Sequence, residues 1–432
     1  MTSAVVALAR AARGGAGQVD YRWVILAVGL VSQTAISGLR QGLPSLAPAL
    51  RSEFSLSLEE LGVVLATVNV GIFLTLFAWG VLADRIGERI VLTAGLAAAA
   101  GALLAAAAAP SYGWLLVALV AAGMAGASAI GASGRAIMGW FGRSERGMAL
   151  GVRQTGVPLG GALAAVALPL VVAAADLRAA LLLLAVGCAA AAIVSWHWMR
   201  EAPEAALAGR PPIVAPEPHR DRRLWRLSFG SSLIVVAQSA LFGFLVIFLH
   251  DEKGWSVAAA AGALGVLYAG GAVARILAGR WSDRIDERVA PLRVLVACSS
   301  VLMVAAAALD AAGVPTLVML AVLLAGGVLA SSWNGLSLTA AAEMSGRERA
   351  GKAIGVQNTM LNGAGSVAPV AFAALVVASS WALSWGALAL CQLAGVALLA
   401  PLVAEERARR AERRGRTCKS SQTTPAAQEK NP

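Results

Sequence analysis

Acidic residues are scarce in this chain, and none falls in the middle of a long apolar run. The sequence holds 24 Asp and Glu residues against 35 Lys and Arg residues, and charged residues make up 14% of it. Hydrophobic residues make up 58%, and the mean hydropathy is +0.73. Soluble domains carry about 25% charged residues. The composition therefore excludes an ordinary soluble protein and predicts a membrane protein.

Cysteine and histidine, which form disulfides and many metal sites, are also rare. The four cysteines lie in apolar runs or, in the last case, in the C-terminal tail: Cys188, Cys298, Cys391 and Cys418. The three histidines lie at the ends of apolar runs or in the polar segment between them: His197, His219 and His250. No nucleophile, metal-ligand or phosphate-loop spacing accompanies them. We expect no disulfide, no metal site, no cofactor and no enzymatic activity.

Long apolar runs recur along the whole chain, parted by short polar breaks. A hydrocarbon core of about 30 Å needs roughly 20 apolar residues per helical crossing. Twelve runs are long enough, at residues 23–49, 59–83, 90–109, 114–140, 148–175, 180–200, 227–250, 257–280, 291–310, 315–343, 352–378 and 382–404. The expected fold class is an all-α membrane protein with twelve transmembrane helices.

The basic residues predict the orientation of these helices, because cytoplasmic loops accumulate Lys and Arg. Most basic residues fall on the side of the N-terminus, whereas the opposite loops hold only Arg51, Arg178 and Lys253. We expect a multi-pass protein of the inner membrane with both termini cytoplasmic and no cleavable signal peptide. The net charge of +11 is interpreted as this topological signal, and nothing supports binding to nucleic acid. The basic C-terminal tail would attract anionic membrane lipid.

The sequence also contains an internal repeat. GVLADRIGER at 80–89 recurs as GRWSDRIDER at 279–288, and SERGMALGVRQT at 144–155 recurs as ERAGKAIGVQNT at 348–359. The matching order indicates a duplicated six-helix unit. The expected domains are an N-terminal tail at 1–22, a six-helix bundle at 23–200, a Pro- and Arg-rich linker at 201–226, a second bundle at 227–404 and a basic tail at 405–432.

These repeated motifs, the layout of six plus six helices and the basic central loop resemble the major facilitator superfamily of transporters over essentially the whole chain. The stretch GVRQTGVPLGG at 151–161 is also similar to bacterial organic-anion and cyanate-type permeases. The resemblance implies two pseudo-symmetric six-helix bundles around a central cavity, related by an axis along the membrane normal. It further implies a monomeric secondary transporter whose cavity opens alternately to either face.

The resemblance assigns a role to the charged motif between spans two and three. In the family this motif latches the two bundles together when the outer side is open, because its carboxylate can interact with a facing helix N-terminus and with guanidinium groups. By residue match the latch comprises Gly80, Asp84, Arg85, Gly87 and Arg89, with a second copy at Asp283 and Arg284. Asp286 stands where the first copy has Gly87, so the first copy is expected to be the stronger latch.

Four arginines fall inside the apolar runs: Arg40, Arg135, Arg153 and Arg275. A charge at this depth costs several kcal/mol and usually faces a cavity or a partner. We expect Arg40, among the glycines and prolines of span one, to bind an anionic substrate by paired hydrogen bonds. The alternative is that it reaches the outer headgroups or a carbonyl group. Arg275 is either a second anion ligand or a snorkelling residue, and Arg135 and Arg153 are expected to pair with the loop motifs.

Uncharged polar residues complete the candidate site. Gln33, Gln238 and Asn334 are expected to line the cavity, although hydrogen bonding between helices would explain them equally well. Span five contains residues that would let helices pack closely and bend: Gly151, Gly156, Pro158, Gly160 and Gly161. Their spacing differs by one residue from the Gly-Pro-x-x-Gly-Gly signature of many exporters in the family. This difference disfavours drug export.

Three functions are therefore compared. The arginines and the missing mid-span carboxylates favour a secondary active transporter of a small organic anion by alternating access. A proton-coupled exporter of hydrophobic or cationic compounds would need an embedded carboxylate. A transporter-like membrane sensor would usually append a signalling domain. The coupling partner is either a proton, carried by Glu343, a histidine or the substrate itself, or a counter-anion, and facilitated flux would need neither.

Overall fold

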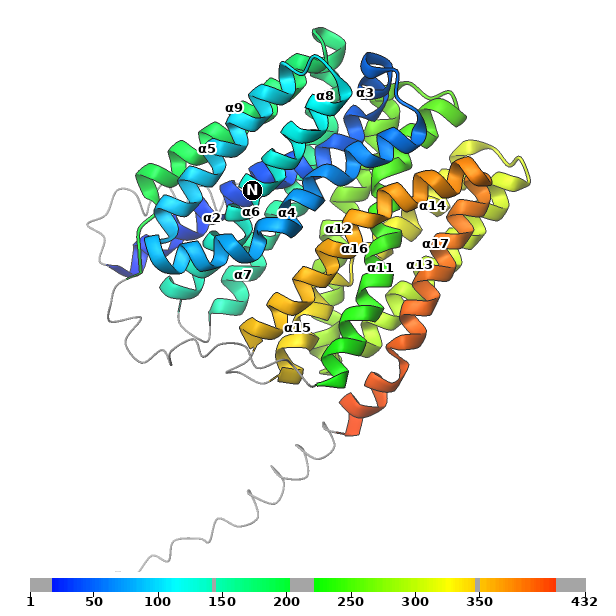
Figure 1. Cartoon of the computed structure of the whole chain (residues 1–432). Helices are drawn as coiled ribbons and strands as arrows, with labels where there is room; N and C mark the ends of the chain where they lie inside the picture. The colour runs from blue at the N-terminus through cyan, green and yellow to red at the C-terminus, as the bar shows by residue number, and fades with distance from the viewer. Residues whose placement is uncertain (1–17, 142–144, 203–220, 346–349, 409–432) are drawn as a thin grey trace, which may run out of the picture.

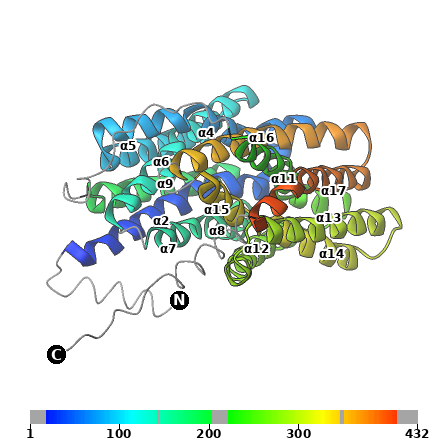
Figure 2. The same cartoon turned by 90° about the horizontal axis from the view of Figure 1, so that it is seen from below.

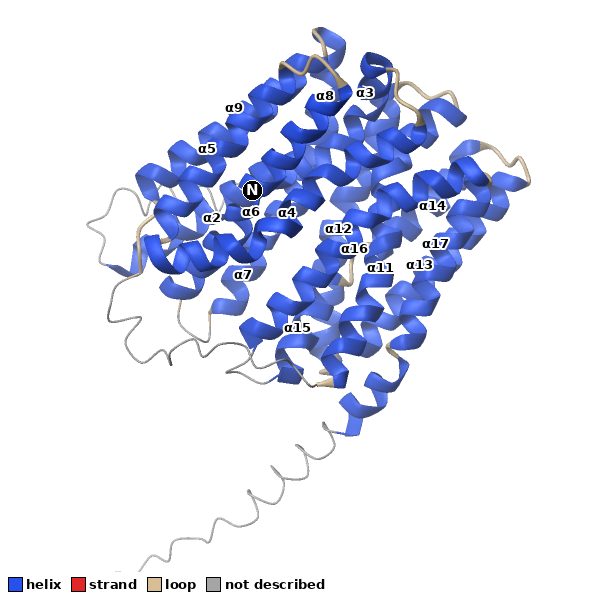
Figure 3. Cartoon of the chain, in the orientation of Figure 1, coloured by secondary structure: helices blue, strands red, loops and turns tan. Residues whose placement is uncertain are grey.

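The computed structural model describes residues 18–141, 145–202, 221–345 and 350–408, and these residues form helices joined by short connections (Figure 3). Within these ranges twelve helical segments are long and apolar enough to cross a membrane. This result confirms the all-α fold class and the twelve predicted spans. Residues 1–17 of the expected tail at 1–22, most of the linker (203–220) and the C-terminal tail from 409 lie outside the described residues. Residues 18–22 of the expected tail are helical, because α2 begins at Gln18.

The first bundle is built from the helices of spans one to six. They are α2 (Gln18–Gly42) with η1 (Leu43–Leu46) and α3 (Ala47–Phe54), α4 (Leu58–Ile86), α5 (Glu88–Ala107), α6 (Tyr112–Trp140), α7 (Arg146–Gln154) with α8 (Gly156–Ala174), and α9 (Leu177–Trp198). Pro44 lies in η1 and Pro48 in the first turn of α3, where proline ends one helical segment and begins another.

The second bundle repeats the order. It comprises α11 (Arg222–Ile247) with η2 (Phe248–Glu252), α12 (Val257–Ile285), α13 (Val289–Ala311), α14 (Thr316–Ala330) with α15 (Asn334–Ser345), α16 (Ala350–Ala378) and α17 (Trp381–Leu398). Because α11 begins at Arg222, the last five residues of the expected linker, 222–226, are helical. Helical structure also continues past 404, since span twelve extends from Trp381 to Ala408.

The short connections opposite the chain ends carry strong helix-start signals. At five of them a serine or aspartate side chain accepts a hydrogen bond from the backbone N–H three residues later: Ser57, Ser111, Asp176, Ser256 and Ser380. Ser57 and Glu60 form a complete capping box. Each cap satisfies a backbone donor that the first turn of the helix leaves free. We call this membrane face the loop end, and the face where the described chain begins and ends the terminal end.

The bundles contact each other through two helix pairs, α4 with α16 and α8 with α12 (Figures 1 and 2). Small residues bring the backbones close. A Cβ atom placed on Gly62 of α4 would lie 2.8 Å from the carbonyl oxygen of Pro369 in α16. At the loop end Arg51 of α3 forms an ion pair with Asp251 of η2, and α3 also contacts α11.

Spans five and ten are each broken into two helices. In each of them the helix nearer the terminal end packs inside its own bundle. Helix α7 contacts α2, α6 and α8, whereas α15 contacts α11, α12, α13 and α16. The contacts between the bundles therefore include the loop-end elements η1 and α3, which pack on α11, and the long helices in between.

Candidate functional site

Arg40 lies near the end of α2 and faces the second bundle. The position that a Cβ atom would take on Gly365 of α16 is 3.9 Å from Nη2 of Arg40. Its side chain is partly buried, and the described residues offer it no hydrogen bond or ion pair. A desolvated guanidinium group without a carboxylate leaves its donors available to an anion. No carbonyl group of the described residues accepts a hydrogen bond from Arg40, so the alternative of a carbonyl partner has no support, and the anion-binding role stays a prediction.

Tyr268 of α12 bridges the two bundles next to Arg40. Its hydroxyl donates to the carbonyl oxygen of Gln41 at 3.1 Å, and its ring lies at right angles to Phe242 with centroids 5.0 Å apart. A small cavity of about 10 Å³ opens beside this contact, and it is lined by Gln41, Pro158, Phe242, Tyr268, Gly271, Arg275 and Ser331. The lining comes from both bundles, and the volume suffices for about one water molecule.

Arg275 meets two other predicted residues at the break between α14 and α15. The carbonyl oxygen of Ser331 accepts a hydrogen bond from Arg275 Nε at 2.8 Å and another from Asn334 Nδ2 at 3.1 Å. Asn334 also donates to Gln238 Oε1 at 3.3 Å. The carbonyl is available because the helix stops at Ala330. The structure thus brings Arg275, Gln238 and Asn334 together and leaves the two Nη groups of Arg275 without a hydrogen-bond partner among the described residues.

Gln33 lies in a separate network inside the first bundle. Arg153 Nη1 donates to Gln33 Oε1 at 2.9 Å and to Ser133 Oγ at 3.0 Å, and Arg153 is only 7% exposed. The expectation that Arg153 pairs with a loop motif is therefore wrong, because its partners are neutral groups on α2 and α6. In the second bundle Gln357 occupies the matching place and bonds Ser228 and Ser337.

The hydrogen bonds and the ion pair found for the described residues of the first charged motif lie within its own bundle. Arg89 Nε donates to the carbonyl oxygen of Trp196 at 2.8 Å, and its guanidinium group lies 4.4 Å from the centre of the Trp196 ring. Arg135 pairs with Glu88 at 3.3 Å, as expected. Gly87 has a φ of 89°, Gly80 faces open space and Arg85 is exposed, while the Asp84 side chain lies outside the described residues. The latch role remains a prediction.

A glutamate after the sixth span binds the start of the third helix. Glu201 Oε1 accepts the Arg89 backbone N–H at 3.3 Å. Burial alone would raise the pKa of Glu201, but hydrogen bonds with the Glu88 side chain and with the backbone of Arg89 and Glu88, together with the charge of Arg135, hold that pKa below its usual value. This contact was not predicted from the sequence.

The second charged motif repeats the arrangement with Glu406 after the twelfth span. Glu406 accepts the backbone N–H groups of Arg288 and Val289 at 2.6 and 3.0 Å. Arg288 also pairs with Asp283 and with Glu343, at 2.5 and 3.1 Å. Burial lowers the pKa of Arg288, yet these two carboxylates outweigh burial and raise it. Arg284 is exposed. Asp286 ends α12 with a φ of 54°, a left-handed conformation that aspartate tolerates better than most residues.

The glycines of span five differ in their surroundings. A Cβ atom on Gly160 would lie 2.3 Å from the carbonyl oxygen of Thr34, and one on Gly156 would lie 3.0 Å from Thr34 Oγ1. One on Gly161 would lie 3.1 Å from the Tyr268 ring, whereas Gly151 faces open space. Helix α7 ends at Gln154 and α8 begins at Gly156. Close packing therefore occurs at three of the four glycines, and the helix break lies between them and Gly151.

Comparisons with known proteins agree with this geometry. The family model described as the Major Facilitator Superfamily matches residues 25–369. An uncharacterized MFS-type transporter of Mycobacterium tuberculosis (strain H37Rv) is 33% identical over 397 residues, which cover 91% of this chain and 88% of that protein. The hexuronate transporter of Bacillus subtilis is 24% identical over 306 residues, or 66% of this chain and 72% of that protein.

Solved structures show the same fold. A bacterial homologue of the human lysosomal transporter Spinster, in an inward-facing and occupied conformation, has a TM-score of 0.68 at 17% identity, covering 91% of this chain and 97% of that chain. Its inward-facing and unoccupied form gives a TM-score of 0.69 at 16% identity, covering 89% and 96%. At these identities the likeness concerns the fold alone.

Proposed function

The chain belongs to the Major Facilitator Superfamily, and we propose from this premise that it is a secondary active transporter of a small organic anion. The observation that carries the proposal is Arg40, a cation at the interface of the bundles with no partner among the described residues. Arg275 supplies a second guanidinium group from the other bundle, beside the cavity that both bundles line. A carboxylate held between them would gain charge-assisted hydrogen bonds from both sides.

The distribution of charge supports an anion over a cation. Arg153 bonds neutral groups and Arg135 bonds Glu88, so the embedded charge near the interface is positive. The related hexuronate transporter is named for a carboxylate substrate, which agrees with this assignment. A cationic substrate would need an embedded carboxylate, and the residues that line the cavity include none.

We assign the terminal end to the cytoplasm, because the basic loops lie there. The loop end, which Arg51 and Asp251 hold together, then faces outward. With α7 and α15 packed inside their own bundles, the structure corresponds to a transporter closed on the outer side. The intrabundle contacts of both charged motifs agree with a released latch.

Uptake into proteoliposomes tests the substrate class. Purified protein is reconstituted and offered hexuronates, other monocarboxylates, dicarboxylates, cyanate and organic cations, with and without a pH gradient or a trapped counter-anion. We expect carboxylates to accumulate, and the dependence on the gradient or the trapped anion identifies the coupling partner. Transport of cations with no transport of any anion would contradict the proposal.

Breaking the outer ion pair should shift the protein toward its outward-open state. Arg51 and Asp251 are 39% and 31% exposed, and exposed ion pairs contribute about 0–1 kcal/mol. We therefore expect Arg51→Gln to change the conformational equilibrium by up to about fivefold. Spin labels on cysteines introduced at Glu53 and Glu252, with the native cysteines replaced by serine, would report the change as a larger long-distance population.

The charge swap Arg51→Asp with Asp251→Arg serves as the control, because it restores opposite charges at the same place. It should return the distance distribution toward that of the wild type. An unchanged distribution in Arg51→Gln would show that the ion pair has no part in outer closure.

A further inference from the structure

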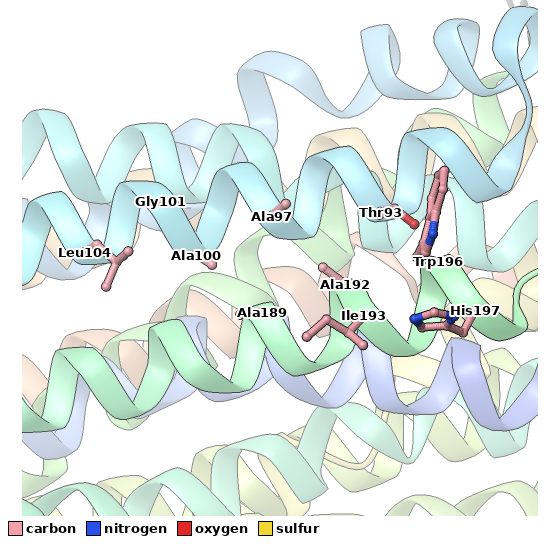
Figure 4. A pocket seen from close by; sticks show the side chains of 10 residues that line it. All are labelled: Thr93, Ala97, Ala100, Gly101, Leu104, Ala189, Ala192, Ile193, Trp196 and His197. Carbon is pink, nitrogen blue, oxygen red and sulfur yellow. The ribbon is translucent and has the colours of Figure 1, made fainter.

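A groove runs along the surface of the first bundle, between the helices α5 and α9. It encloses about 450 Å³ and is lined by Thr93, Ala97, Ala100, Gly101, Leu104, Ala189, Ala192, Ile193, Trp196 and His197. Figure 4 shows Thr93, Trp196 and His197 at one end of the groove and Leu104 at the other. Neither the candidate substrate site nor the charged motifs account for this volume.

The groove is a narrow slot, which exists because the residues at its floor have small side chains or none. Its floor consists of alanines and one glycine, while Leu104, Ile193 and Trp196 are largely exposed beside it. A Cβ atom on Gly101 would meet nothing within 4 Å. From Thr93 to Leu104 the helix rises about 16 Å, which is close to half of a hydrocarbon core of about 30 Å. The slot begins about 8 Å after the start of α5 at Glu88 and passes the middle of that helix. Its small lining residues set its width.

The terminal end of the groove is polar and carries positive charge. The Thr93 hydroxyl is buried and has no hydrogen-bond partner among the described residues. His197 lines the same end. The Arg89 guanidinium group lies over Trp196, a lining residue, at 4.4 Å from the ring centre, and no ion pair to it is found in the described part of the chain. An apolar slot that ends in hydrogen-bond donors and a cation complements an amphiphile with an anionic head.

We propose that this groove binds one phospholipid of the terminal-end leaflet. One acyl chain occupies the slot between α5 and α9, and the phosphate of an anionic headgroup lies near Arg89, His197 and Thr93. Anionic phospholipid is attracted to basic residues at the membrane surface, and the open slot adds apolar contact that a flat helix face would not offer. The lipid would bridge the third and sixth helices beside Glu201, and the proposal does not depend on the transported substrate.

Thermal stability of the full chain in detergent tests the site. After delipidation, the protein is titrated with phosphatidylglycerol, phosphatidylcholine or inorganic phosphate, and the Tm is measured. We expect phosphatidylglycerol to raise the Tm more than phosphatidylcholine, and phosphate alone to have no effect. Gly101→Leu, which fills the slot from an open position, should lose at least half of the rise caused by phosphatidylglycerol.

Two variants control the experiment. Gly187→Leu adds the same side chain at an exposed position of α9 that also has open space, and it should keep the full rise. Arg89→Gln should reduce the preference for phosphatidylglycerol over phosphatidylcholine. A full rise in Gly101→Leu, an equal loss in Gly187→Leu, or a rise produced by inorganic phosphate alone would overturn the proposal.

Discussion

Arg40→Ala should lower the initial rate of anion uptake by roughly 30-fold to several thousand-fold, because removing one partner of a buried charge pair costs about 2–5 kcal/mol. The loss is expected in transport and not in folding. Arg40 has no hydrogen bond or ion pair within the described residues, so its removal deletes a desolvated charge without breaking a polar interaction among them. The Tm in detergent should stay unchanged or rise. Uptake of the best substrate from the panel, measured at equal protein density, gives the comparison.

Two further variants separate binding from structure. Arg40→Lys keeps the charge but loses the paired hydrogen bonds, so its rate should lie between those of the wild type and Arg40→Ala. Arg135→Gln removes an arginine that already has Glu88 as its partner, and it should lower the Tm because this ion pair is lost. Full uptake by Arg40→Ala would remove Arg40 from the substrate site. A large fall in its Tm would indicate a structural role.

Gly160→Ala should destabilise the protein by about 1–3 kcal/mol, the usual cost of overpacking a core. Its Cβ atom would lie 2.3 Å from the Thr34 carbonyl oxygen and 2.7 Å from the Gly38 backbone nitrogen. Both atoms belong to the backbone of α2, which cannot move aside as a flexible side chain would. The two helices must separate, and the Tm in detergent should fall.

Gly151→Ala is the matched control on the same span. The site has open space, and an alanine in a helix is favoured over glycine by roughly 0.5–1 kcal/mol. The Tm should therefore rise slightly. The two substitutions are identical and lie nine residues apart. If the Tm falls in one variant and rises in the other, the loss of stability comes from the contact of α8 with α2. Equal changes in both variants would contradict the packing argument.

The spans could be predicted because the bilayer dictates a minimum apolar length for each crossing. Their ends could not, since helices continue beyond the apolar core into polar sequence, as Arg222–Arg226 do in α11. The break around Pro44 was signalled by proline. The break at Ser331–Trp333 was not, because that stretch contains neither proline nor glycine, and it decides where the carbonyl that binds Arg275 lies.

The candidate site was predictable only in its residue types. Depth and charge pointed to Arg40 and Arg275, but whether an embedded polar residue faces the interface or a neighbouring helix depends on helix rotation. Gln33 and Gln238 match in the repeat, yet the first bonds Arg153 and the second bonds Asn334. Glu201 and Glu406 bind the start of a helix, and the sequence carries a signal for this role: each is a glutamate shortly after the last span of its half.

The contact of the Tyr268 ring with Gly161 has a mechanical consequence. When two helices shift, side chains that are packed between one another must separate first. A flat aromatic ring on a glycine meets no side chain and can slide and tilt without this separation. Gly161 lies six residues into α8, within the membrane, so rocking about this contact would widen one face as it narrows the other.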